Sequence, residues 1–468
     1  MKERKQKNPS QGTCLQKNRT ASEGYAGGQT YIGITENNLT DTHPLGYGLL
    51  EFIVSPSNLN AAYRQVKRNR GAGGIDKMEV GSLKDYLVTH KDELITAIRR
   101  GKYCPNPVRR VEIPKENGSK RQLGIPTVVD RVIQQAITQV LTPIYEPQFS
   151  LYSYGFRPKR NAHQALQQCR KYITEGYSYA VDIDLEKFFD KVNHSKLIEV
   201  LSRKIKDGRA ISLIHKYLNA GVVVKHKFEP SHQGVPQGGP LSPLLSNIIL
   251  NELDKELEYR GHKFVRYADD MVILCRSKRS AQRILENITR FIESRLFLSV
   301  NREKSKVCHI REVKFLGYSF YKAKGEGRLR IHPKSVQKMK AKIKELTSRS
   351  NGWGNERRKE ALRQYITGWV QYFKLADMKE LLIRTDEWYR RRLRMVIWKQ
   401  WKRTKTKLKN LIRLGINKSK AWEWANTRKG YWHTANSFIL SRTITNERLR
   451  KAGYVFLSDH YRKVRAVN

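Results

Sequence analysis

The sequence predicts an α+β protein whose first two thirds mix strands with helices and whose last third is helical. Two short apolar segments that carry acidic residues, 179–185 and 263–275, have the alternating or continuously buried pattern of strands. In 357–373 the apolar residues recur at helical spacing, and all eight tryptophans lie between Trp353 and Trp432. We therefore expect a sheet-containing part followed by a helical part.

Composition narrows the class of protein. The chain has 468 residues, which is room for about two to four domains. Its 39% hydrophobic content supports buried cores, and it has no apolar run long enough to span a membrane. The basic N-terminus lacks the apolar stretch of a secretory signal. Five scattered cysteines without C-x-x-C spacing argue against a disulfide scaffold or zinc module and favour a reducing compartment.

The formal net charge of +48 predicts a polyanionic partner, with nucleic acid favoured over an anionic membrane surface. The charge is uneven: residues 331–468 hold 35 Lys and Arg against 10 Asp and Glu. This basic, tryptophan-rich third therefore has a different task from the rest of the chain. A solvated charged face and core packing of the tryptophans are the alternative explanations for most of these residues.

The first hundred residues contain a tail and a basic loop. Residues 1–45 are rich in Gly, Asn, Gln, Thr and Lys, which predicts a flexible tail. A helical pattern starts at Pro56 and is followed by the glycine-rich segment 71–74, next to Arg68 and Arg70. This segment is typical of a turn, and phosphate contact is the alternative.

Residues 111–126 predict a β-hairpin around an Asn-Gly turn, with Lys115, Lys120 and Arg121 close to that turn. Cations beside a tight turn suit a triphosphate or a nucleic-acid backbone. An amphipathic helix is predicted for 130–145, after which the chain becomes basic again.

The acidic residues inside the predicted strands are the candidate catalytic groups. Asp269 and Asp270 lie at the tip of an apolar hairpin, and Asp182 and Asp184 lie on one face of another strand. Buried carboxylates are costly unless something neutralises them, and a divalent cation is the natural partner. Between the two strands, residues 236–240 (PQGGP) form an unobstructed loop before a helix.

The order of these motifs resembles the palm of a reverse transcriptase: DIDLEKFFD, PQGGPLSP, YADD, NREKSK and FLGY. Further blocks resemble bacterial group II intron reverse transcriptase–maturases, namely VEIPKENGSKRQLGIP, SYGFRPKR, GWVQYFK, WYRRRLR, WKQWKR and ANTRKGYW. The resemblance covers about residues 55–465 and is greatest to the compact class that ends without an endonuclease domain.

The resemblance implies a right-hand polymerase with palm and fingers, an α-helical thumb or maturase domain and a small C-terminal DNA-binding region. The implied segments are a flexible tail (1–45), an RNA-binding N-terminal extension (46–110), fingers and palm (111–330), thumb/maturase domain (331–405) and DNA-binding region (406–468).

The implied reaction is two-metal nucleotidyl transfer, in which a 3′-hydroxyl attacks an α-phosphate while two Mg²⁺ ions stabilise the attacking and leaving oxygens. The resemblance makes Asp184 and Asp269 the main metal ligands, with Asp270 in support, and leaves Asp182 outside the ligand set. Lys304 matches a lysine proposed to protonate pyrophosphate.

Other site residues also follow from the resemblance. Phe189 matches the aromatic residue that excludes a ribose 2′-hydroxyl, and a core phenylalanine is the alternative. Gln237 and Gly238 match the loop beside the template and the incoming nucleotide. Lys115 and Arg121 match cations that grip the triphosphate.

The candidate nucleic-acid contacts are cations in three parts of the chain. In the last third, cations alternate with Trp398 and Trp401, which favours backbone binding with base stacking. Arg357, Arg358 and Lys359 are placed on the polar face of the helix over 357–373. The predicted contacts are Arg68, Arg70, Arg157, Arg160, Arg391, Arg392, Lys402 and Arg403.

The expected function is therefore an RNA-directed DNA polymerase that also binds its intron RNA and assists splicing, in association with nucleic acid in the bacterial cytoplasm. Its expected partners are group II intron RNA, an RNA template with a DNA primer, target DNA and deoxynucleoside triphosphates, with no membrane. The oligomeric state stays open. The alternatives are a splicing protein with vestigial polymerisation and another reverse transcriptase class, such as a retron or phage-defence enzyme.

Overall fold

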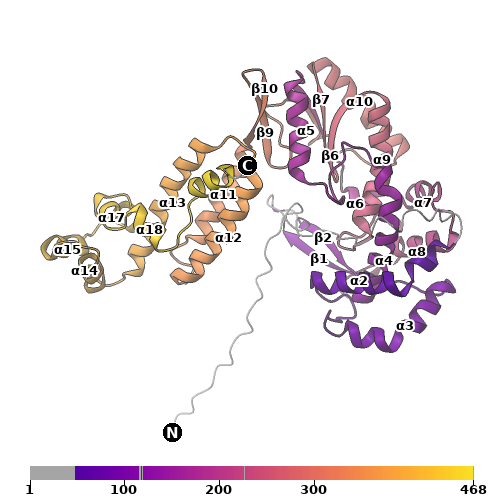
Figure 1. Ribbon diagram of the computed structural model, residues 1–468, viewed down its shortest axis with the longest axis horizontal. Coiled ribbons are helices and arrows are strands. Elements are labelled where there is room, and N and C mark those ends of the chain that lie inside the picture. Colours follow the sequence, from indigo (N-terminus) through magenta and orange to yellow (C-terminus); the bar gives the residue numbers. More distant parts are fainter. Residues whose placement is uncertain (1–47, 115–117, 119, 226, 467–468) are drawn as a thin grey trace, which may run out of the picture. The chain divides into compact units, whose positions relative to one another are not determined.

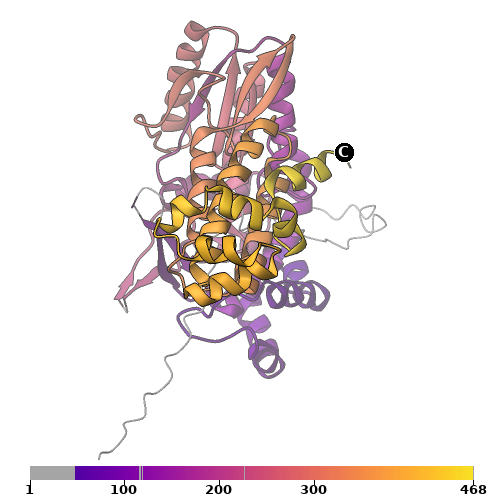
Figure 2. The same ribbon diagram turned by 90° about the vertical axis from the view of Figure 1, so that its left-hand side faces the viewer.

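The computed structural model describes residues 48–114, 118, 120–225 and 227–466, which fall into two compact units (Figures 1 and 2). The first unit comprises the described residues up to Asn161 together with Phe189–Glu252. The second comprises Ala162–Phe188 and the described residues from Leu253 onward. The predicted tail over 1–45 and the predicted triphosphate contact Lys115 lie outside the described residues.

The first unit combines helices with a four-stranded sheet in the order β2-β1-β4-β5. The hairpin predicted over 111–126 is confirmed: β1 and β2 are antiparallel, with Pro114 opposite Lys120 beside the turn. The elements of this unit are α1 (Leu49–Ile53), α2 (Pro56–Asn69), α3 (Leu83–Arg99), β1 (Val108–Pro114), β2 (Lys120–Ile125), α4 (Val128–Tyr145), the 3-10 helix η2 (Glu146–Gln148), α7 (His194–Ser202), α8 (Gly208–Leu218), β4 (Val222–Val224) and β5 (Lys227–Glu229).

Helix α4 forms the centre of the first unit. Thr127 caps its N-terminus by accepting a hydrogen bond from the Asp130 N–H, and much of the helix is buried. Helix α2 packs against α4 through a stripe that includes Ala62 and Val66, as its periodicity predicts. The Asn58 side-chain amide donates to the Ala136 carbonyl and fixes the two helices further.

The second unit contains a four-stranded antiparallel sheet in the order β6-β7-β3-β8. Helix α10 packs on β3 and β8. Helix α5 packs on β6 (Figure 1). The elements up to the helical last third are α5 (Ala162–Thr174), β3 (Tyr179–Ile183), β6 (Lys263–Tyr267), β7 (Asp270–Cys275), α10 (Lys278–Arg295), β8 (Lys306–His309) and the hairpin β9 (Tyr318–Ala323) and β10 (Glu326–Ile331). Helices α6 (Phe188–Lys191) and α9 (Ser242–Tyr259) each contain residues of both units.

The last third of the chain is helical, as predicted, and belongs to the second unit (Figure 2). Its helices are α11 (Pro333–Leu346), α12 (Asn355–Phe373), α13 (Lys379–Gln400), α14 (Thr404–Arg413), α15 (Lys418–Ala425), α16 (Tyr431–Thr434), α17 (Phe438–Thr443), α18 (Asn446–Lys451) and α19 (Leu457–Ala466). The fully buried Asp386 of α13 anchors α19, because its carboxylate accepts hydrogen bonds from the Leu457 and Ser458 N–H groups at 3.0 and 2.8 Å. Across the described part of the chain, we find no helix with the length and apolar character of a membrane span.

The turn at 315–318, in the sheet-containing part of the second unit, packs against helix α12. The Tyr372 hydroxyl donates to the Leu316 carbonyl at 2.9 Å, and the Tyr318 hydroxyl donates to the Tyr372 carbonyl. Gly317 has φ +82°, and a Cβ there would lie 3.2 Å from both Phe373 and Ser335. The FLGY segment is therefore packed tightly against the helical last third.

Candidate active site

The central strand of the second unit's sheet carries two of the predicted acids. Asp182 lies in β3, and Asp184 follows the strand directly. Ile183 is opposite Met271 and Tyr267 is opposite Asp270, so the register brings Asp184 level with Asp270. Paired residues in an antiparallel sheet share a face, and alternate residues do too. Asp182, Asp184 and Asp270 therefore point to one side of the sheet, as the alternation in the sequence predicts.

The third predicted acid, Asp269, lies in the turn between β6 and β7. Both Asp269 and Asp270 are exposed, whereas the flanking strand residues Val265, Ala268 and Met271 are buried. Ala268 has φ +59°, a left-handed conformation that is costly for a residue with a Cβ. The turn thus presents two adjacent carboxylates from a buried hairpin.

The carboxylates raise one another's proton affinity. The pKa of Asp270 is raised to about 7 by loss of surrounding water and by the charges of Asp269, Asp182 and Asp184. The pKa of Asp182 is raised to about 6, first by burial; Lys306 opposes this shift and Asp184 adds to it. The site concentrates negative charge that a bound cation would relieve.

Lys304 lies next to Asp184. Its ammonium is 3.3 Å from the Asp184 carboxylate, with both side chains substantially exposed, at 62% and 39%. The backbone of Asp184 is held by the following segment: the Asp184 N–H donates to the Ser305 hydroxyl at 3.0 Å, and the Asn301 N–H donates to the Asp184 carbonyl at 2.8 Å. The structure therefore brings together Asp184, Asp269, Asp270 and Lys304, four residues that the sequence places up to 120 positions apart.

The donors fit a hard divalent cation better than any other metal class. Carboxylate oxygens are the ligands that Mg²⁺ prefers, and the acids lie within each other's electrostatic reach. Within the described ranges, no three His, Cys, Asp or Glu side chains already approach closely enough to enclose an ion. The cationic group next to Asp184 in this structure is the ammonium of Lys304.

A second group of predicted residues lies in the first unit. The Arg121 guanidinium donates to the Gln237 side-chain oxygen at 2.9 Å, and the Gly124 N–H donates to the Gln237 carbonyl at 2.7 Å. Gly238 has φ +131°, and a Cβ there would lie 2.5 Å from the Gly124 carbonyl oxygen. The loop over 236–240 is therefore fitted against β2, and Arg121 and Gln237 form one polar pair.

Phe189 is buried, at 7% exposure, and its carbonyl accepts a 2.6 Å hydrogen bond from the Val235 N–H just before that loop. The backbone of Phe189 thus helps to fix the start of the PQGGP segment. Its ring is a packed side chain in this structure, and its predicted role in sugar selection stays a prediction.

Comparison with known proteins identifies the family. Residues 113–320 match the family described as reverse transcriptase (RNA-dependent DNA polymerase). Residues 336–415 match the group II intron, maturase-specific domain. Protein YkfC of Escherichia coli (strain K12) is 33% identical over 325 residues, which cover 60% of this chain and 85% of that protein. The chain belongs to the group II intron reverse transcriptase–maturases.

Two further relatives of this reverse transcriptase–maturase have names that refer to introns. Group II intron-encoded protein LtrA of Lactococcus lactis subsp. cremoris is 30% identical over 383 residues, covering 67% of this chain and 62% of LtrA. The putative COX1/OXI3 intron 2 protein of Saccharomyces cerevisiae is 30% identical over 348 residues, covering 61% of this chain and 40% of that protein. The chain thus spans less than two thirds of the length of either relative.

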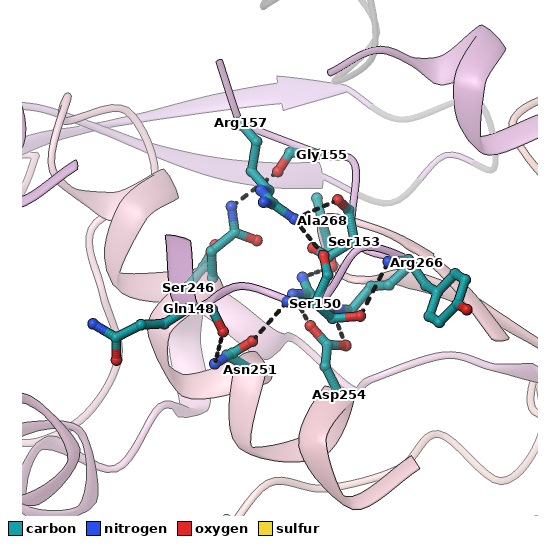
Figure 3. A network of polar contacts seen from close by, with 12 residues as sticks. Gln148, Ser150, Ser153, Gly155, Arg157, Ser246, Asn251, Asp254, Arg266 and Ala268 are labelled. Atoms are coloured by element: carbon teal, nitrogen blue, oxygen red, sulfur yellow. Dashed lines mark hydrogen bonds and ion pairs between the residues drawn. The ribbon is translucent and has the colours of Figure 1, made fainter. Parts of the chain in front are cut away.

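Two of the predicted nucleic-acid contacts of this reverse transcriptase–maturase are wrong. Arg157 is buried, and its guanidinium donates to Glu146 at 2.8 Å. It also donates to the Ser153 carbonyl at 2.8 Å (Figure 3). Arg392 is buried at 9% exposure, and it donates to the Thr347 hydroxyl and carbonyl. Both guanidiniums donate to carbonyls inside the protein, so these donors are not available to a phosphate.

The stacking prediction for Trp398 is also wrong, because its ring is 1% exposed and packs against Trp401 and Lys407. Arg358, predicted on the polar face of α12, is likewise buried and donates to the Trp353 carbonyl at 2.9 Å.

The remaining predicted contacts are available at the surface to different degrees. Arg391 is half-buried: it donates to the Trp432 carbonyl at 3.0 Å, with its guanidinium 3.9 Å from the centre of that ring. Arg160 is also half-buried and donates to the Leu151 carbonyl. The exposed members of the set are Arg68, Arg70, Lys402 and Arg403.

The sequence reasoning missed the residues that surround the acids. Lys306 and Lys314 lower the pKa of Asp182, and Arg266 contacts the turn that carries Asp269. Arg266 could have been found, because it is the one charged residue between apolar neighbours in FVRYADD. The lysines carry no such signal, since their closeness to Asp182 depends on the pairing of β3 with β8.

The raised pKa of Asp270 predicts how the stability of the metal-free protein depends on pH. The folded-state pKa of Asp270 is near 7, whereas its unfolded-state pKa is about 3.9. The free energy of unfolding therefore decreases as the pH rises from about 4 to 7. We expect Asp270→Asn to raise the melting temperature at pH 8 by roughly 2 °C in the presence of a chelator. The difference in melting temperature between the variant and the parent protein should become smaller as the pH falls toward 4.

The measurement is thermal unfolding of both proteins across this pH range. Glu286→Gln, an exposed acid of α10, is the control and should show no such trend. Equal melting temperatures for Asp270→Asn and the parent protein at pH 8 would contradict the repulsion between the carboxylates.

Proposed function

We propose that this chain is the RNA-directed DNA polymerase of a group II intron, and that its helical last third binds the intron RNA and supports splicing. One observation carries the catalytic part of the proposal. Asp184, Asp269 and Asp270 meet at one end of the sheet β6-β7-β3-β8, inside the segment that matches the reverse transcriptase family.

In the terms of a right-hand polymerase, we assign the sheet of the second unit to the palm and the hairpin β1–β2 to the fingers. Helices α11–α13 are the thumb, and the helices from α14 onward form the DNA-binding region. These assignments keep the boundaries predicted from the sequence: 46–110 for the RNA-binding extension, 111–330 for fingers and palm, 331–405 for the thumb/maturase domain and 406–468 for the DNA-binding region.

Asp184, Asp269 and Asp270 would hold two Mg²⁺ ions, which supply charge stabilisation at the attacking 3′-oxygen and at the leaving pyrophosphate. Before that, the ammonium of Lys304 screens Asp184 at 3.3 Å. With a cation on Asp184, Lys304 would no longer be paired with that carboxylate, and its ammonium could donate a proton to the departing pyrophosphate. The three carboxylates thus fix the reacting groups, and the lysine completes the proton transfer.

The remaining residues would bind and select the nucleotide. Arg121, with Lys115, would grip the triphosphate, since a guanidinium can donate to two phosphate oxygens together. Gln237 and Gly238 would lie against the template and incoming base, and the Arg121–Gln237 hydrogen bond couples these two tasks. The buried ring of Phe189 would exclude a 2′-hydroxyl and so select deoxynucleotides.

The proposed partners are the intron RNA, an RNA template with a DNA primer, target DNA and deoxynucleoside triphosphates, with the protein acting in the bacterial cytoplasm. The maturase-specific match over 336–415 favours this reading over a retron or phage-defence enzyme. The retained acids argue against a splicing protein that has lost polymerisation.

Primer extension tests the proposal. With an RNA template, a DNA primer and Mg²⁺, we expect the chain to incorporate deoxynucleotides at least about a hundredfold more efficiently than ribonucleotides. Phe189→Ala should reduce this preference about tenfold or more, because the clash with the 2′-hydroxyl is removed. Tight RNA binding without extension under any divalent cation would instead support the splicing protein with vestigial polymerisation.

A further inference from the structure

A buried ion pair lies beneath the turn that carries Asp269 (Figure 3). Arg266, in β6, and Asp254, in α9, are 1% and 0% exposed. The Arg266 Nε donates to Asp254 Oδ1 at 2.7 Å, and its Nη2 donates to Asp254 Oδ2. Both carboxylate oxygens are thus used in a bidentate contact that fixes the plane of the guanidinium.

The remaining arm of the guanidinium reaches the turn. The Arg266 Nη1 donates to the Ala268 carbonyl oxygen at 2.9 Å. Ala268 is the residue with φ +59°, and its carbonyl belongs to the peptide group that begins Asp269. This hydrogen bond therefore acts directly on the peptide plane from which the Asp269 side chain projects.

Stability alone does not account for this pair. A buried ion pair pays a large desolvation penalty, and apolar residues of similar size often replace one without loss of stability. An apolar pair, however, leaves the Ala268 carbonyl without its donor and the left-handed turn without support. The contact that an apolar pair cannot replace is therefore the hydrogen bond from Arg266 to the Ala268 carbonyl.

Arg266 also approaches from the side away from the acids. In the β6–β7 pairing, Arg266 is opposite Met271 and Tyr267 is opposite Asp270. Neighbouring residues of a strand point to opposite faces, so the guanidinium leaves the carboxylate face clear for substrate.

We propose that Arg266, oriented by Asp254, is a positioning residue that holds the 268–270 turn in the conformation required for polymerisation. The inference rests on the proposed role of Asp269 and Asp270. Without the third arm of Arg266, the turn moves among conformations in which the two carboxylates are misplaced, and the chemical step slows while nucleotide and RNA binding persist.

Arg266→Lys is the first test, because lysine keeps a positive charge for Asp254 but cannot bond both the carboxylate and the turn. We expect kcat for deoxynucleotide addition to fall about 10- to 100-fold, with KM and RNA affinity within about threefold of the parent protein. In the metal-free protein, amide hydrogen exchange over 268–270 should accelerate at least about tenfold, while exchange in β3 stays unchanged. Arg392→Lys, which alters a buried arginine that also donates to backbone carbonyls, should leave exchange in the turn unchanged.

The double variant Arg266→Met, Asp254→Leu tests the same point if Arg266→Lys does not fold. It should keep its melting temperature within about 5 °C and still lose kcat tenfold or more. A folded variant of either kind with parental kcat and parental exchange in the turn would overturn the positioning role. Full activity of Asp269→Asn would refute the proposed function instead, and the exchange measurement would then decide the role of Arg266 by itself.

Discussion

Replacing Asp184 with asparagine should reduce the rate of primer extension on an RNA template by about a thousandfold or more, whereas Asp182→Asn should stay within about tenfold of the parent protein. The two acids are two residues apart and share one face of the sheet, so the pair provides a matched comparison. Each change removes one negative charge and preserves the shape of the side chain.

The difference arises from what surrounds each carboxylate. Asp184 is 39% exposed, is level with Asp270, and has Lys304 as an exchangeable partner. Asp182 is half-buried, and Lys306 and Lys314 offset only part of the rise that burial causes in its pKa. A carboxylate that coordinates a catalytic metal stabilises charge in the transition state directly, and loss of such electrostatic stabilisation is among the most severe single effects in catalysis.

Single-turnover primer extension in saturating Mg²⁺ measures this effect, with RNA affinity as the control for folding. Asp269→Ala combined with Asp270→Ala should be equally inactive, and both proteins should bind RNA as tightly as the parent. Equal losses for Asp182→Asn and Asp184→Asn would show that the total charge of the site matters more than its geometry. Full extension by the double variant would refute the assignment of the site.

The strands and the acids were predictable because local pattern determines them. Period-two alternation around Asp182 and Asp184 and the apolar run on both sides of Asp269 and Asp270 define two strands without any knowledge of their pairing. The pairing itself, with β3 between β7 and β8, joins segments about 90 and 125 residues apart. No local pattern encodes it, so the placing of Lys306 beside Asp182 needed the structure.

The wrong assignments share one physical cause. The sequence shows that a residue is cationic, but it does not show which buried backbone carbonyls need a side-chain hydrogen-bond donor. Arg157, Arg358 and Arg392 each satisfy such carbonyls from the inside of the protein, and clusters such as RRRLR contain both buried and accessible members. Burial of Arg358 follows from helical spacing after all, since it lies four residues before the buried Leu362.

The distinction between buried and exposed cations identifies the residues that should determine RNA affinity. Lys402, Arg403, Lys405 and Lys409 are all exposed, just before or within α14, and Lys405 and Lys409 lie one helical turn apart. Within the described residues, none of the four forms an ion pair with a carboxylate, so no such pair competes with phosphate binding. The match to the maturase-specific domain, over 336–415, includes all four residues.

Changing these four residues to glutamine should lower the affinity for intron RNA by about a hundredfold or more at 0.1 M salt. Each neutralised phosphate contributes about 0.7 to 0.9 to the slope of log affinity against log salt concentration, so we expect the slope to fall by about three. Splicing support should fall with affinity, whereas extension of a primer on a short RNA template should change much less, because the acids of the sheet are untouched.

Charge-matched controls separate a local footprint from the effect of net charge. Lys278, Arg279, Arg283 and Arg290 are exposed on α10, and their change to glutamine removes the same four charges. Removal of 335–468 is a poor alternative, since Tyr372 and Phe373 pack against the 315–318 turn and their loss would disturb the polymerase as well. Equal falls in the salt slope for the α10 and α14 variants would mean that the surplus of positive charge binds RNA diffusely, and a slope unaffected by the α14 changes would exclude this helix from the RNA interface.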